Sequence, residues 1–543
     1  MRKILLIIIL FIISLNSSFY FSGLCQKSES DMSFPNLTRE SSHNNDDEYN
    51  LDSRFRGNDT TKFYLDYQNL VQLSKTSNPS RELKEKLEKQ LNTPIILQPS
   101  VGEITFLNEG MLGDFFRVAS WNIERGFNID LIKKVFLVNI TSDENNDTLQ
   151  EELRVLRETS IIIINEVDIG LPRTKYQNIV KELASVLKMG FIFGTEFIEV
   201  DPYQLGIEKF TNEERTFLEP QALEQLDNID KNRFKGLHGT AVLSKYPILN
   251  AKIVRLPDCY KWYEEESNKL SALELARREA AEKVFSSKVL TELRQGGRMA
   301  IVADLLLPNN NKITVVATHL ENRCVPECRY KQLEFLLNRL RNVNNPLVLA
   351  GDFNTTGADA TPVSVKKEVL KRVKDPVYVA KQAILYLTPI SLIQALGLNT
   401  ANAFKQFKDP TTKNIPIILP NKERKLFDLL TEFRFNDGGA FDLRGISGKA
   451  YGYSAFSGNS NERSFKGYKH TFELERNLGI AKYKLDWFFV KPLKLKDPKD
   501  KEGSYVFAPH FGRTLQLVNR AFGNRISDHD PIVVDIPVRE PLR

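Results

Sequence analysis

A short stretch of the chain carries the residue types that chemistry on a charged substrate requires. Four apolar residues, Leu347 to Ala350, run directly into Gly351-Asp-Phe-Asn354. A short apolar run that ends in this way predicts a buried strand, which would deliver a carboxylate and an amide to the edge of a sheet. Glycine has no Cβ atom, so Gly351 would let a ligand approach the backbone closely. The stretch therefore marks a candidate active site.

Similar polar residues follow or close other apolar runs. Together with the stretch above, they are Asn122, Glu166, His319, Asp352, Asn354, Asp486, Asp528 and His529. Strands that share a fold can gather such residues at one rim of their sheets. Carboxylates suit a hard divalent cation, and histidine exchanges protons near neutral pH. This set of residues predicts the hydrolysis of a phosphoester.

The apolar runs also predict the elements that position these residues. They recur at Phe115–Ile123, Ile161–Ile164, Phe191–Phe193, Thr240–Leu243, Met299–Leu307, Ile313–Leu320, Leu347–Ala350, Leu485–Val490 and Pro531–Ile536. Runs of this length predict strands, and residues 329–341, with leucines on one side, predict a helix between two of them. We therefore expect an α/β domain over residues 115–537 in which helices cover the sheets.

Three segments interrupt this frame. They lie near residues 201–235, 260–297 and 357–469, and they combine charged stretches with helical patterns. Long insertions on a scaffold often shape access of the substrate to the site. We expect the last of them to decide the substrate.

The N-terminal segment predicts export. Arg2 and Lys3 precede an apolar run from Ile4 to Leu15, which is the pattern of a secretory signal over residues 1–25. The alternative is an uncleaved anchor from Ile4 to Leu24, which would attach the protein to a membrane. In an oxidising compartment, Cys324 and Cys328 would form a disulfide if the backbone turns between them, and two free thiols are the alternative.

A tether and a lead-in precede the domain. Residues 26–79 are polar and rich in Ser, Asn and Asp, which predicts a disordered tether. Within it, residues 51–59 resemble the translated repeat elements of some bacterial genomes, which indicates a bacterial source. Residues 80–114 are expected to form a helical lead-in, because Ser80 can cap a short helix with Leu83, Leu87 and Leu91 on one face.

Length and charge set broad limits on the function. The 543 residues exceed one simple core, and an apolar content of 41% supports a large globular body. The net charge of +6 arises from 75 basic and 69 acidic residues. So small a basic excess is compatible with a phosphate-bearing substrate, but it does not indicate a dedicated nucleic-acid-binding protein.

Seven motifs, in this order, resemble those of the endonuclease/exonuclease/phosphatase superfamily. They are Ser120-Trp-Asn-Ile-Glu-Arg-Gly126, Asn165-Glu-Val-Asp168, Gly239-Thr-Ala-Val-Leu-Ser244, Thr318-His-Leu320, Gly351-Asp-Phe-Asn354, Lys484-Leu-Asp-Trp-Phe488 and Ser527-Asp-His-Asp-Pro531. The resemblance spans about residues 115–537. It implies an α/β (α+β) fold, a four-layer sandwich of two packed mixed β-sheets flanked by helices, with helical insertions. It also implies magnesium-dependent cleavage of a phosphoester by water.

The resemblance implies a role for each matching residue. Glu166 is similar to the principal metal ligand of the family, Asn122 to its neighbour in the metal and phosphate site, and Asp528 to a second carboxylate on the metal side. Arg173 resembles a phosphate-contacting arginine. His238 lies where the family also carries polar residues, so both are candidates for substrate binding.

The remaining residues match the family's catalytic positions. Asp352 and Asn354 resemble the pair that positions water and phosphate, with Asp352 as general base and Asn354 also in contact with the substrate. His529 resembles the catalytic histidine on the scissile phosphate, and Asp486 the carboxylate that orients it. His319 matches the histidine that protonates the leaving group in the deoxyribonuclease, sphingomyelinase and inositol-phosphatase branches.

These resemblances predict an exported phosphodiesterase that requires Mg²⁺, with Mn²⁺ as the alternative cation. The expected substrate is a nucleic acid, because nothing in the sequence specifies a hydrophobic hairpin that would insert into lipid. The alternatives are a phospholipid headgroup, as in sphingomyelinases, an inositol phosphate, or a non-catalytic binding protein on the same fold. No protein partner is inferred.

Overall fold

The computed structural model describes residues 64–99, 105–109, 113–137, 147–200, 230–267, 293–355, 424–442, 468, 470–473, 482–492 and 512–538. The predicted signal segment lies outside these residues, and so do the residues of the proposed bacterial repeat element. The same holds for most of the three predicted insertions. The unit formed by residues 1–57 is wholly outside, so the description below concerns the unit that starts at Asn58.

The larger sheet has nine strands in a mixed arrangement. Its order is β1-β5-β6-β4-β3-β16-β15, with β2 paired to β3 and β8 paired to β5. The strands are β1 (Ile95–Leu97), β2 (Leu107–Glu109), β3 (Gly113–Arg125), β4 (Ile161–Ile169), β5 (Gly190–Glu199), β6 (Leu237–Ser244), β8 (Arg294–Gly296), β15 (Arg513–Thr514) and β16 (Ile532–Pro537). Among its pairs, β3 runs parallel to β4, and β6 runs antiparallel to both β4 and β5.

The smaller sheet has five strands in the order β14-β11-β10-β9-β7. The strands are β7 (Ile248–Arg255), β9 (Met299–Leu306), β10 (Lys312–His319), β11 (Leu347–Asp352) and β14 (Asp486–Lys491). In it, β10 and β11 are parallel, whereas β9 and β14 pair antiparallel to their neighbours. A further two-stranded sheet joins β12 (Phe472–Glu473) to β13 (Lys482–Tyr483).

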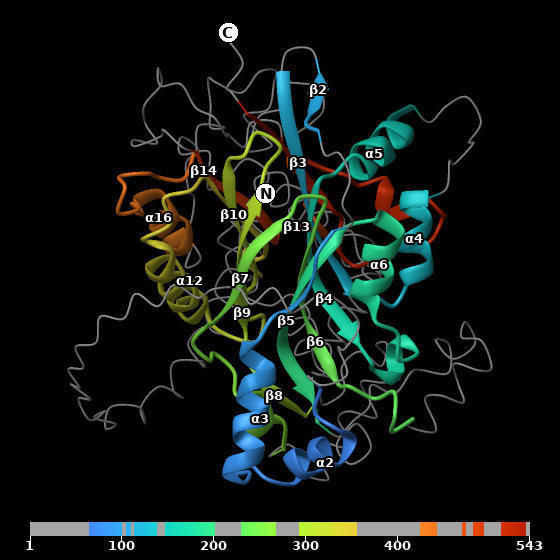
Figure 1. Cartoon of the computed structure of the whole chain (residues 1–543), viewed down its shortest axis with the longest axis vertical. Coiled ribbons are helices and arrows are strands. Elements are labelled where there is room, and N and C mark those ends of the chain that lie inside the picture. The colour runs from blue at the N-terminus through green and yellow to red at the C-terminus, as the bar shows by residue number, and fades with distance from the viewer. Residues whose placement is uncertain are drawn as a thin grey trace, which may run out of the picture. The chain divides into compact units, whose positions relative to one another are not determined.

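Helices cover the outer face of each sheet. They are α2 (Tyr67–Lys75), α3 (Arg81–Asn92), α4 (Ile129–Leu137), α5 (Asp147–Arg157), α6 (Ile179–Leu187), α10 (Trp262–Ser267), α12 (Pro326–Leu340) and α16 (Arg424–Glu432), with short 3-10 helices η4 (Pro172–Thr174) and η9 (Val518–Arg520). Figure 1 shows α4, α5 and α6 on one side of the two sheets and α12 with α16 on the other. The predicted four-layer sandwich is therefore confirmed.

Alternating side chains divide the interior into three apolar cores. In β4, Ile161 and Ile163 face the core between the two sheets, and Ile162 and Ile164 face the core under α4, α5 and α6. In β11, Val348 and Ala350 face the core between the sheets, and Leu347 and Leu349 face α12 and α16. Successive side chains of a strand point to opposite faces, so a strand covered on both faces reads as a continuous apolar run.

Helix α3 falls in the predicted lead-in, and helix α2 falls at the end of the predicted tether. Ser80 accepts a hydrogen bond from the backbone N–H of Leu83 and begins α3, whose Leu83, Leu87 and Leu91 are buried. Residues 26–79 were expected to form a disordered tether. This is wrong for its last part, because Leu70 and Leu73 of α2 are fully buried in the core under the larger sheet. Two leucines three residues apart suffice to bury one face of a short helix.

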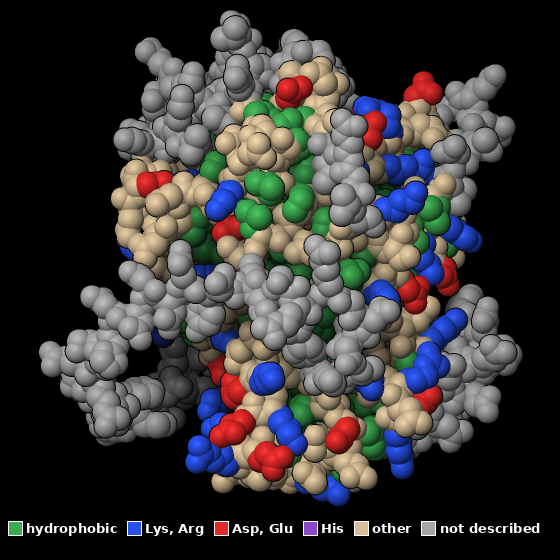
Figure 2. Space-filling model, in the orientation of Figure 1, with side chains coloured by type: hydrophobic (Ala, Val, Ile, Leu, Met, Phe, Trp, Pro, Cys, Tyr) green, Lys and Arg blue, Asp and Glu red, His purple; other side chains and the backbone are tan. Residues whose placement is uncertain are grey.

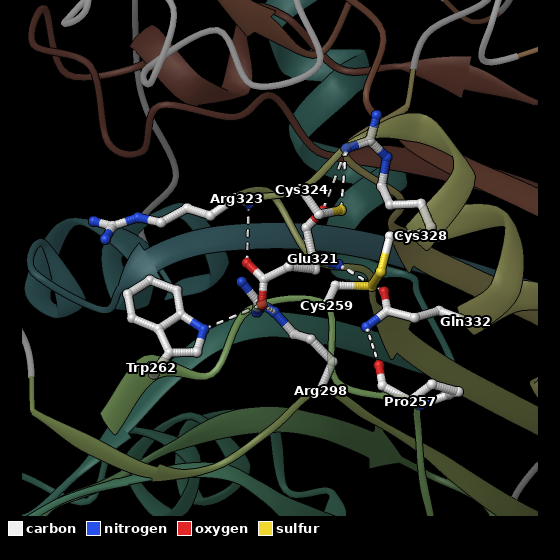
Figure 3. Close-up of a disulfide and its surroundings, with 10 residues drawn as sticks. Pro257, Cys259, Trp262, Arg298, Glu321, Arg323, Cys324, Cys328 and Gln332 are labelled. Atoms are coloured by element: carbon white, nitrogen blue, oxygen red, sulfur yellow. Dashed lines mark hydrogen bonds and ion pairs between the residues drawn. A yellow bond between two sulfur atoms is a disulfide. The ribbon is translucent and has the colours of Figure 1, made fainter. Parts of the chain in front are cut away.

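The cysteines pair differently from the expectation. A disulfide joins Cys259 to Cys328 across 69 residues, and Cys324 is the free thiol among the described cysteines. Figure 3 shows Cys324 beside this disulfide, in the loop that leads into α12. A pairing of Cys324 with Cys328 would have joined two residues of one turn. The observed disulfide instead connects the segment after β7 to the start of α12.

The described surface is mixed in charge. Figure 2, which views the molecule in the orientation of Figure 1, shows Lys and Arg side chains interspersed with Asp and Glu side chains over the described residues. Within the described part of the chain, no helix is both long enough and apolar enough to cross a membrane. The predicted anchor from Ile4 to Leu24 lies outside that part.

Candidate active site

Three strand ends of the smaller sheet bring three predicted residues side by side. In the pairing of β10 with β11, His319 is opposite Asp352, and in the pairing of β11 with β14, Asp352 is opposite Asp486. The apolar residues of these strands fill the cores on both faces of the sheet, so the polar residues fall at the strand ends. Directly opposite residues on paired strands are neighbours in space. The sheet register itself therefore builds half of the site.

The packing of the smaller sheet requires glycine at position 351. Its backbone has φ of 138°, and a Cβ atom at this position would meet the carbonyl oxygen of Thr318 at 1.9 Å. The close approach that requires glycine is therefore that of the neighbouring strand β10. The predicted approach of a ligand to Gly351 stays a prediction.

Two asparagines of the larger sheet connect it to Asp352. Asn122 Nδ2 donates hydrogen bonds to Asp352 Oδ2 at 3.1 Å and to Glu166 Oε1 at 3.2 Å. Asn165 Oδ1 accepts from the backbone N–H of Asp352 at 3.0 Å, and its Nδ2 donates to the carbonyl oxygen of Thr318 at 3.1 Å. Buried amides that are fully engaged in this way fix both partners in place. They hold the two sheets together at the site.

His529 and Asp486 form a buried pair. The ring Nδ1 of His529 lies 2.8 Å from Asp486 Oδ2, and its Nε2 lies 3.7 Å from Asp352 Oδ2. Burial lowers the pKa of His529, but the carboxylates of Asp486 and Asp352 outweigh it and raise this pKa to about 10. Trp121 Nε1 donates to the carbonyl oxygen of His529 and fixes its backbone. The imidazole is therefore positively charged at neutral pH and fixed in its orientation.

Asp352 lies at the centre of the site. Burial raises its pKa to about 7, against the opposing charge of His529. The backbone N–H of Asn354 donates to Asp352 Oδ1 at 2.8 Å, so one oxygen is oriented by the turn and the other faces the histidines. A carboxylate with a pKa near neutrality can take up a proton during a reaction and release it afterwards.

His319 approaches the same oxygen from the other side. Its Nε2 lies 3.6 Å from Asp352 Oδ2, and its Nδ1 lies 2.8 Å from Nη1 of Arg298. Burial and the charge of Arg298 lower the pKa of His319 well below its usual value. The site thus contains one charged histidine, His529, and one neutral histidine, His319.

The strand that carries Glu166 is distorted where its side chain reaches the site. Glu166 has φ of 54°, and the pairing of β4 with β6 shifts register between Ile164 and Val167. Left-handed backbone at a residue other than glycine, at a bulge, is typical of a side chain aimed at a functional site. The Glu166 side chain is partly exposed, beside the buried Asn122.

The oxygen donors around Asn122 fit a hard divalent cation. Asn122 Nδ2 contacts one carboxylate oxygen each from Glu166 and Asp352, so these two carboxylates flank one point. Ligand atoms of Asp352, Asp486 and His529 also lie within 4.8 Å of one another. His529 does not suit a ligand role. A protonated ring carries a hydrogen on each nitrogen, and that of Nδ1 is directed at Asp486, so the ring has no lone pair for a metal ion. The carboxylate oxygens are the fitting donors, because Asn122 presents Nδ2 to them and its Oδ1 accepts from the backbone N–H of Glu124 at 3.1 Å.

Asn354 and Asp528 lie at the edges of this arrangement. Asn354 has φ of 47°, and its Nδ2 donates to the carbonyl oxygen of Leu320 at 3.0 Å. It therefore links the turn after β11 to the loop that follows His319. Asp528 is partly exposed, and its charge contributes to the raised pKa of His529.

Two of the three predicted substrate-binding residues, Arg173 and His238, belong to a buried charge cluster. Arg173 Nε and Nη2 donate to Asp168 at 2.6 and 3.0 Å, and its Nη1 donates to Glu199 at 2.6 Å. His238 Nδ1 lies 2.8 Å from Asp168 Oδ1, and burial lowers its pKa well below the usual value. All three nitrogens of Arg173 thus contact protein carboxylates, which argues against the predicted phosphate contact. Substrate binding by His238 stays a prediction.

Four residues of the site were not identified from the sequence. They are Asn165, Glu196, Thr240 and Arg298. Glu196 Oε1 accepts from the Thr240 hydroxyl at 2.6 Å, and its Oε2 accepts from Arg298 at 2.6 Å. One signal was present for Glu196, since a carboxylate within the apolar strand Gly190–Glu199 must be paired to be buried. Arg298 gives no such signal, because it precedes its strand in sequence.

Several solved structures are similar to this chain at low sequence identity. The structure resembles an endonuclease/exonuclease/phosphatase from Beutenbergia cavernae (14% identity, 78% of this chain and 72% of that chain, TM-score 0.32). It also resembles the human Nocturnin catalytic domain with bound sulfate (14% identity, 82% of this chain and 97% of that chain, TM-score 0.32). A third similar structure is a 3'-5' exonuclease from Neisseria meningitidis (12% identity, 78% of this chain and 99% of that chain, TM-score 0.34). No curated protein sequence matches the chain.

A family model gives the assignment. The model of the Endonuclease/Exonuclease/phosphatase family matches residues 119–529. This match covers most of the chain and contains Asn122, Glu166, His319, Asp352 and His529. The protein therefore belongs to the endonuclease/exonuclease/phosphatase family.

Proposed function

We propose that this protein is an Mg²⁺-dependent phosphodiesterase that cleaves its substrate by in-line attack of water. Members of its family hydrolyse phosphoric esters and generally use a divalent metal. The observation that supports the proposal most directly is that three side-chain nitrogens surround one carboxylate oxygen, Asp352 Oδ2. It lies 3.1 Å from Asn122 Nδ2, 3.6 Å from His319 Nε2 and 3.7 Å from His529 Nε2.

The carboxylates of Glu166 and Asp528 would hold the cation, and Asn122 Nδ2 would fix the Glu166 carboxylate beside it. When bound, the cation supplies positive charge to the phosphoryl oxygens. Mg²⁺ prefers oxygen ligands such as these, and Mn²⁺ shares that preference.

Asp352 is the group that removes the proton from water. Its raised pKa makes it a base of useful strength near neutral pH. The backbone N–H of Asn354 holds Oδ1, and Asn122 reaches Oδ2, so the carboxylate cannot rotate freely. A base whose orientation is fixed before the reaction lowers the entropy cost of the attack.

The two histidines act on the phosphate oxygens. His529, charged and oriented by Asp486, donates to an oxygen that gains negative charge in the transition state. His319 lies on the other side of Asp352 Oδ2, where it can meet the leaving oxygen. Charge on both sides of phosphorus is thereby stabilised in a buried site, where such interactions are strong.

The proposed substrate is a nucleic acid, and the protein is proposed to be exported. The lack of a lipid-inserting motif in the sequence supports the first part, and the small basic excess is compatible with any phosphate-bearing substrate. The N-terminal pattern supports the second, and so does the disulfide between Cys259 and Cys328, because disulfides persist in oxidising compartments. Sphingomyelin and inositol phosphates are the competing substrates.

A substrate panel tests the proposal. The full chain is assayed with Mg²⁺ on plasmid DNA, RNA, sphingomyelin vesicles and phosphoinositides, with EDTA as the metal control. We expect cleavage of nucleic acid that EDTA stops and that Asp352→Asn reduces by about 100-fold. Cleavage confined to sphingomyelin or phosphoinositides would show that the lipid, and not nucleic acid, is the substrate. If none of the substrates is hydrolysed in a metal-stimulated reaction, the protein is a binding protein and not an enzyme.

A further inference from the structure

Arg298 bridges two residues that lie close to each other. It stands directly before β9 and is only 4% exposed. Its Nη1 is 2.6 Å from Glu196 Oε2 and 2.8 Å from His319 Nδ1. Glu196 Oε2 and His319 Nδ1 are themselves 3.7 Å apart. The guanidinium thus bridges a carboxylate and the nearest imidazole nitrogen.

The chemistry of arginine sets the direction of these bonds. A guanidinium has five N–H donors and no acceptor, and it stays charged in proteins. The two hydrogens on Nη1 therefore point to Glu196 and to His319 Nδ1. Because Nδ1 must accept, the proton of the neutral His319 ring is on Nε2.

The opposite nitrogen faces the candidate active site. His319 Nε2 is buried and has no hydrogen-bond partner among the residues that the structure describes. It points toward Asp352 Oδ2 at 3.6 Å, which is too long for a hydrogen bond. A buried N–H without a partner in the protein is costly unless a ligand accepts its hydrogen bond.

Arg298 is itself held firmly on its other side. Its Nε lies 3.5 Å from Glu321 Oε2. Glu321 accepts hydrogen bonds from Trp262 Nε1 at 3.1 Å and from the backbone N–H of Arg323 at 3.0 Å. Figure 3 shows this carboxylate between Trp262 and Arg298, next to the disulfide. The guanidinium is also stacked 5.2 Å from the ring centre of Phe197.

We propose that Arg298 is a positioning residue that fixes His319 with its proton on Nε2, so that this N–H donates to the leaving oxygen of the phosphoester. Without Arg298, Glu196 Oε2 is the nearest acceptor for a proton on Nδ1. The ring would then turn a lone pair toward the site and repel the leaving oxygen. The part that concerns the leaving oxygen rests on the proposed phosphoesterase function, whereas the position of the proton does not.

Three variants isolate this role. Arg298→Met removes the donor and keeps the length of the side chain, and Arg298→Lys keeps a cation that can only donate. Arg294→Met is the matched control. Arg294 is equally buried, at 4% exposed, and its guanidinium is also 5.2 Å from the Phe197 ring, but it donates to Glu199.

The first readout is the ¹⁵N NMR spectrum of the full chain labelled at histidine, with His319→Gln for assignment. We expect the wild-type His319 signals to show a protonated Nε2 and an unprotonated Nδ1. Arg298→Met should move the proton to Nδ1, while Arg298→Lys and Arg294→Met should leave it on Nε2. A wild-type spectrum with the proton on Nδ1 overturns the proposal, even if no variant folds.

The second readout is the dependence of the rate on the leaving group. kcat/KM is compared for the phenyl and 4-nitrophenyl esters of methyl phosphate, since phenol is the poorer leaving group and needs more help. Arg298→Met should lose about 10- to 100-fold more on the phenyl ester than on the nitrophenyl ester. The ratio should stay unchanged in Arg294→Met and recover in Arg298→Lys.

The two readouts separate the possible failures. If the proton moves in Arg298→Met but the rate ratio does not change, His319 does not donate to the leaving oxygen, and that part of the proposal is refuted. If the wild type hydrolyses neither ester nor any substrate of the panel, the proposed function fails, and the NMR spectra still decide the role of Arg298. An unmoved proton in a folded Arg298→Met refutes that role.

Discussion

His529 and Asp486 lie 43 residues apart in sequence and form one buried pair, with 2.8 Å between Nδ1 and Oδ2. The pair raises the pKa of His529 to about 10, so the ring stays charged below that pH. Asp486→Asn removes the negative charge and should lower this pKa. The alkaline limb of kcat/KM should then move to lower pH, with a loss of about 100-fold at pH 8 and a smaller loss at pH 6. An alkaline limb that does not move would contradict the pairing.

Asp352 should set the acid limb of the same profile. Its pKa of about 7 means that it is mostly protonated below that pH and cannot accept a proton from water. We expect kcat/KM to fall about tenfold for each pH unit below 7 and to stay level between the two limbs. Asp352→Glu should keep an acid limb at a shifted midpoint, whereas Asp352→Asn should remove most of the activity. A wild-type rate that is flat from pH 5 to 8 would exclude Asp352 as the base.

Glu166 should affect the cation more than the chemistry. Its carboxylate lies beside Asn122 at a strand bulge, and Glu166→Gln halves its charge-bearing oxygens without changing its size. We expect the Mg²⁺ concentration for half-maximal activity to rise by about tenfold or more, with most of the rate recovered at saturating Mg²⁺. Titration calorimetry with Mg²⁺ measures the same change without a substrate. Glu151→Gln, on the surface of α5, serves as control and should change neither.

The sequence predicted the strand ends better than the contacts behind them. His319, Asp352 and Asp486 end or begin apolar runs, and the register of β10, β11 and β14 places them together as expected. Within a strand that is buried on both faces, a polar residue must be paired, so unpaired polar residues that can serve a site are expected at the strand ends. For this reason the pattern alone indicated the site.

The contacts that tune the site could not be predicted in this way. Glu196 lies in β5 of the larger sheet and Arg298 directly precedes β9 of the smaller sheet, 102 residues away, so they meet only through packing. The pairing of Arg173 with Asp168 could not be predicted either. A motif match shows which residue type is present, but it does not show that the N–H groups of the arginine are already hydrogen-bonded to a carboxylate of the protein. The pairing of Cys328 with Cys259 rather than Cys324 likewise depends on where β7 and α12 lie in space.

The disulfide should stabilise the fold by closing a long loop. Cys259 and Cys328 are separated by 69 residues, and a cross-link over such a loop restricts the unfolded chain. We expect Cys328→Ser to lower the free energy of unfolding by about 4 kcal/mol. Denaturant unfolding, followed by circular dichroism, measures this change. Dithiothreitol should destabilise the wild type by a similar amount.

Cys324→Ser provides the matched control for this prediction. Cys324 lies just before α12, close to Cys328, and its thiol donates to the carbonyl oxygen of Glu321 at 3.3 Å, but it forms no cross-link. A serine hydroxyl can make the same contact, so the free energy of unfolding should change by less than about 1 kcal/mol. A loss in Cys324→Ser as large as that in Cys328→Ser would mean that the local packing of this loop, and not the cross-link, stabilises the protein. Equal stability of the oxidised and reduced wild type would contradict the prediction outright.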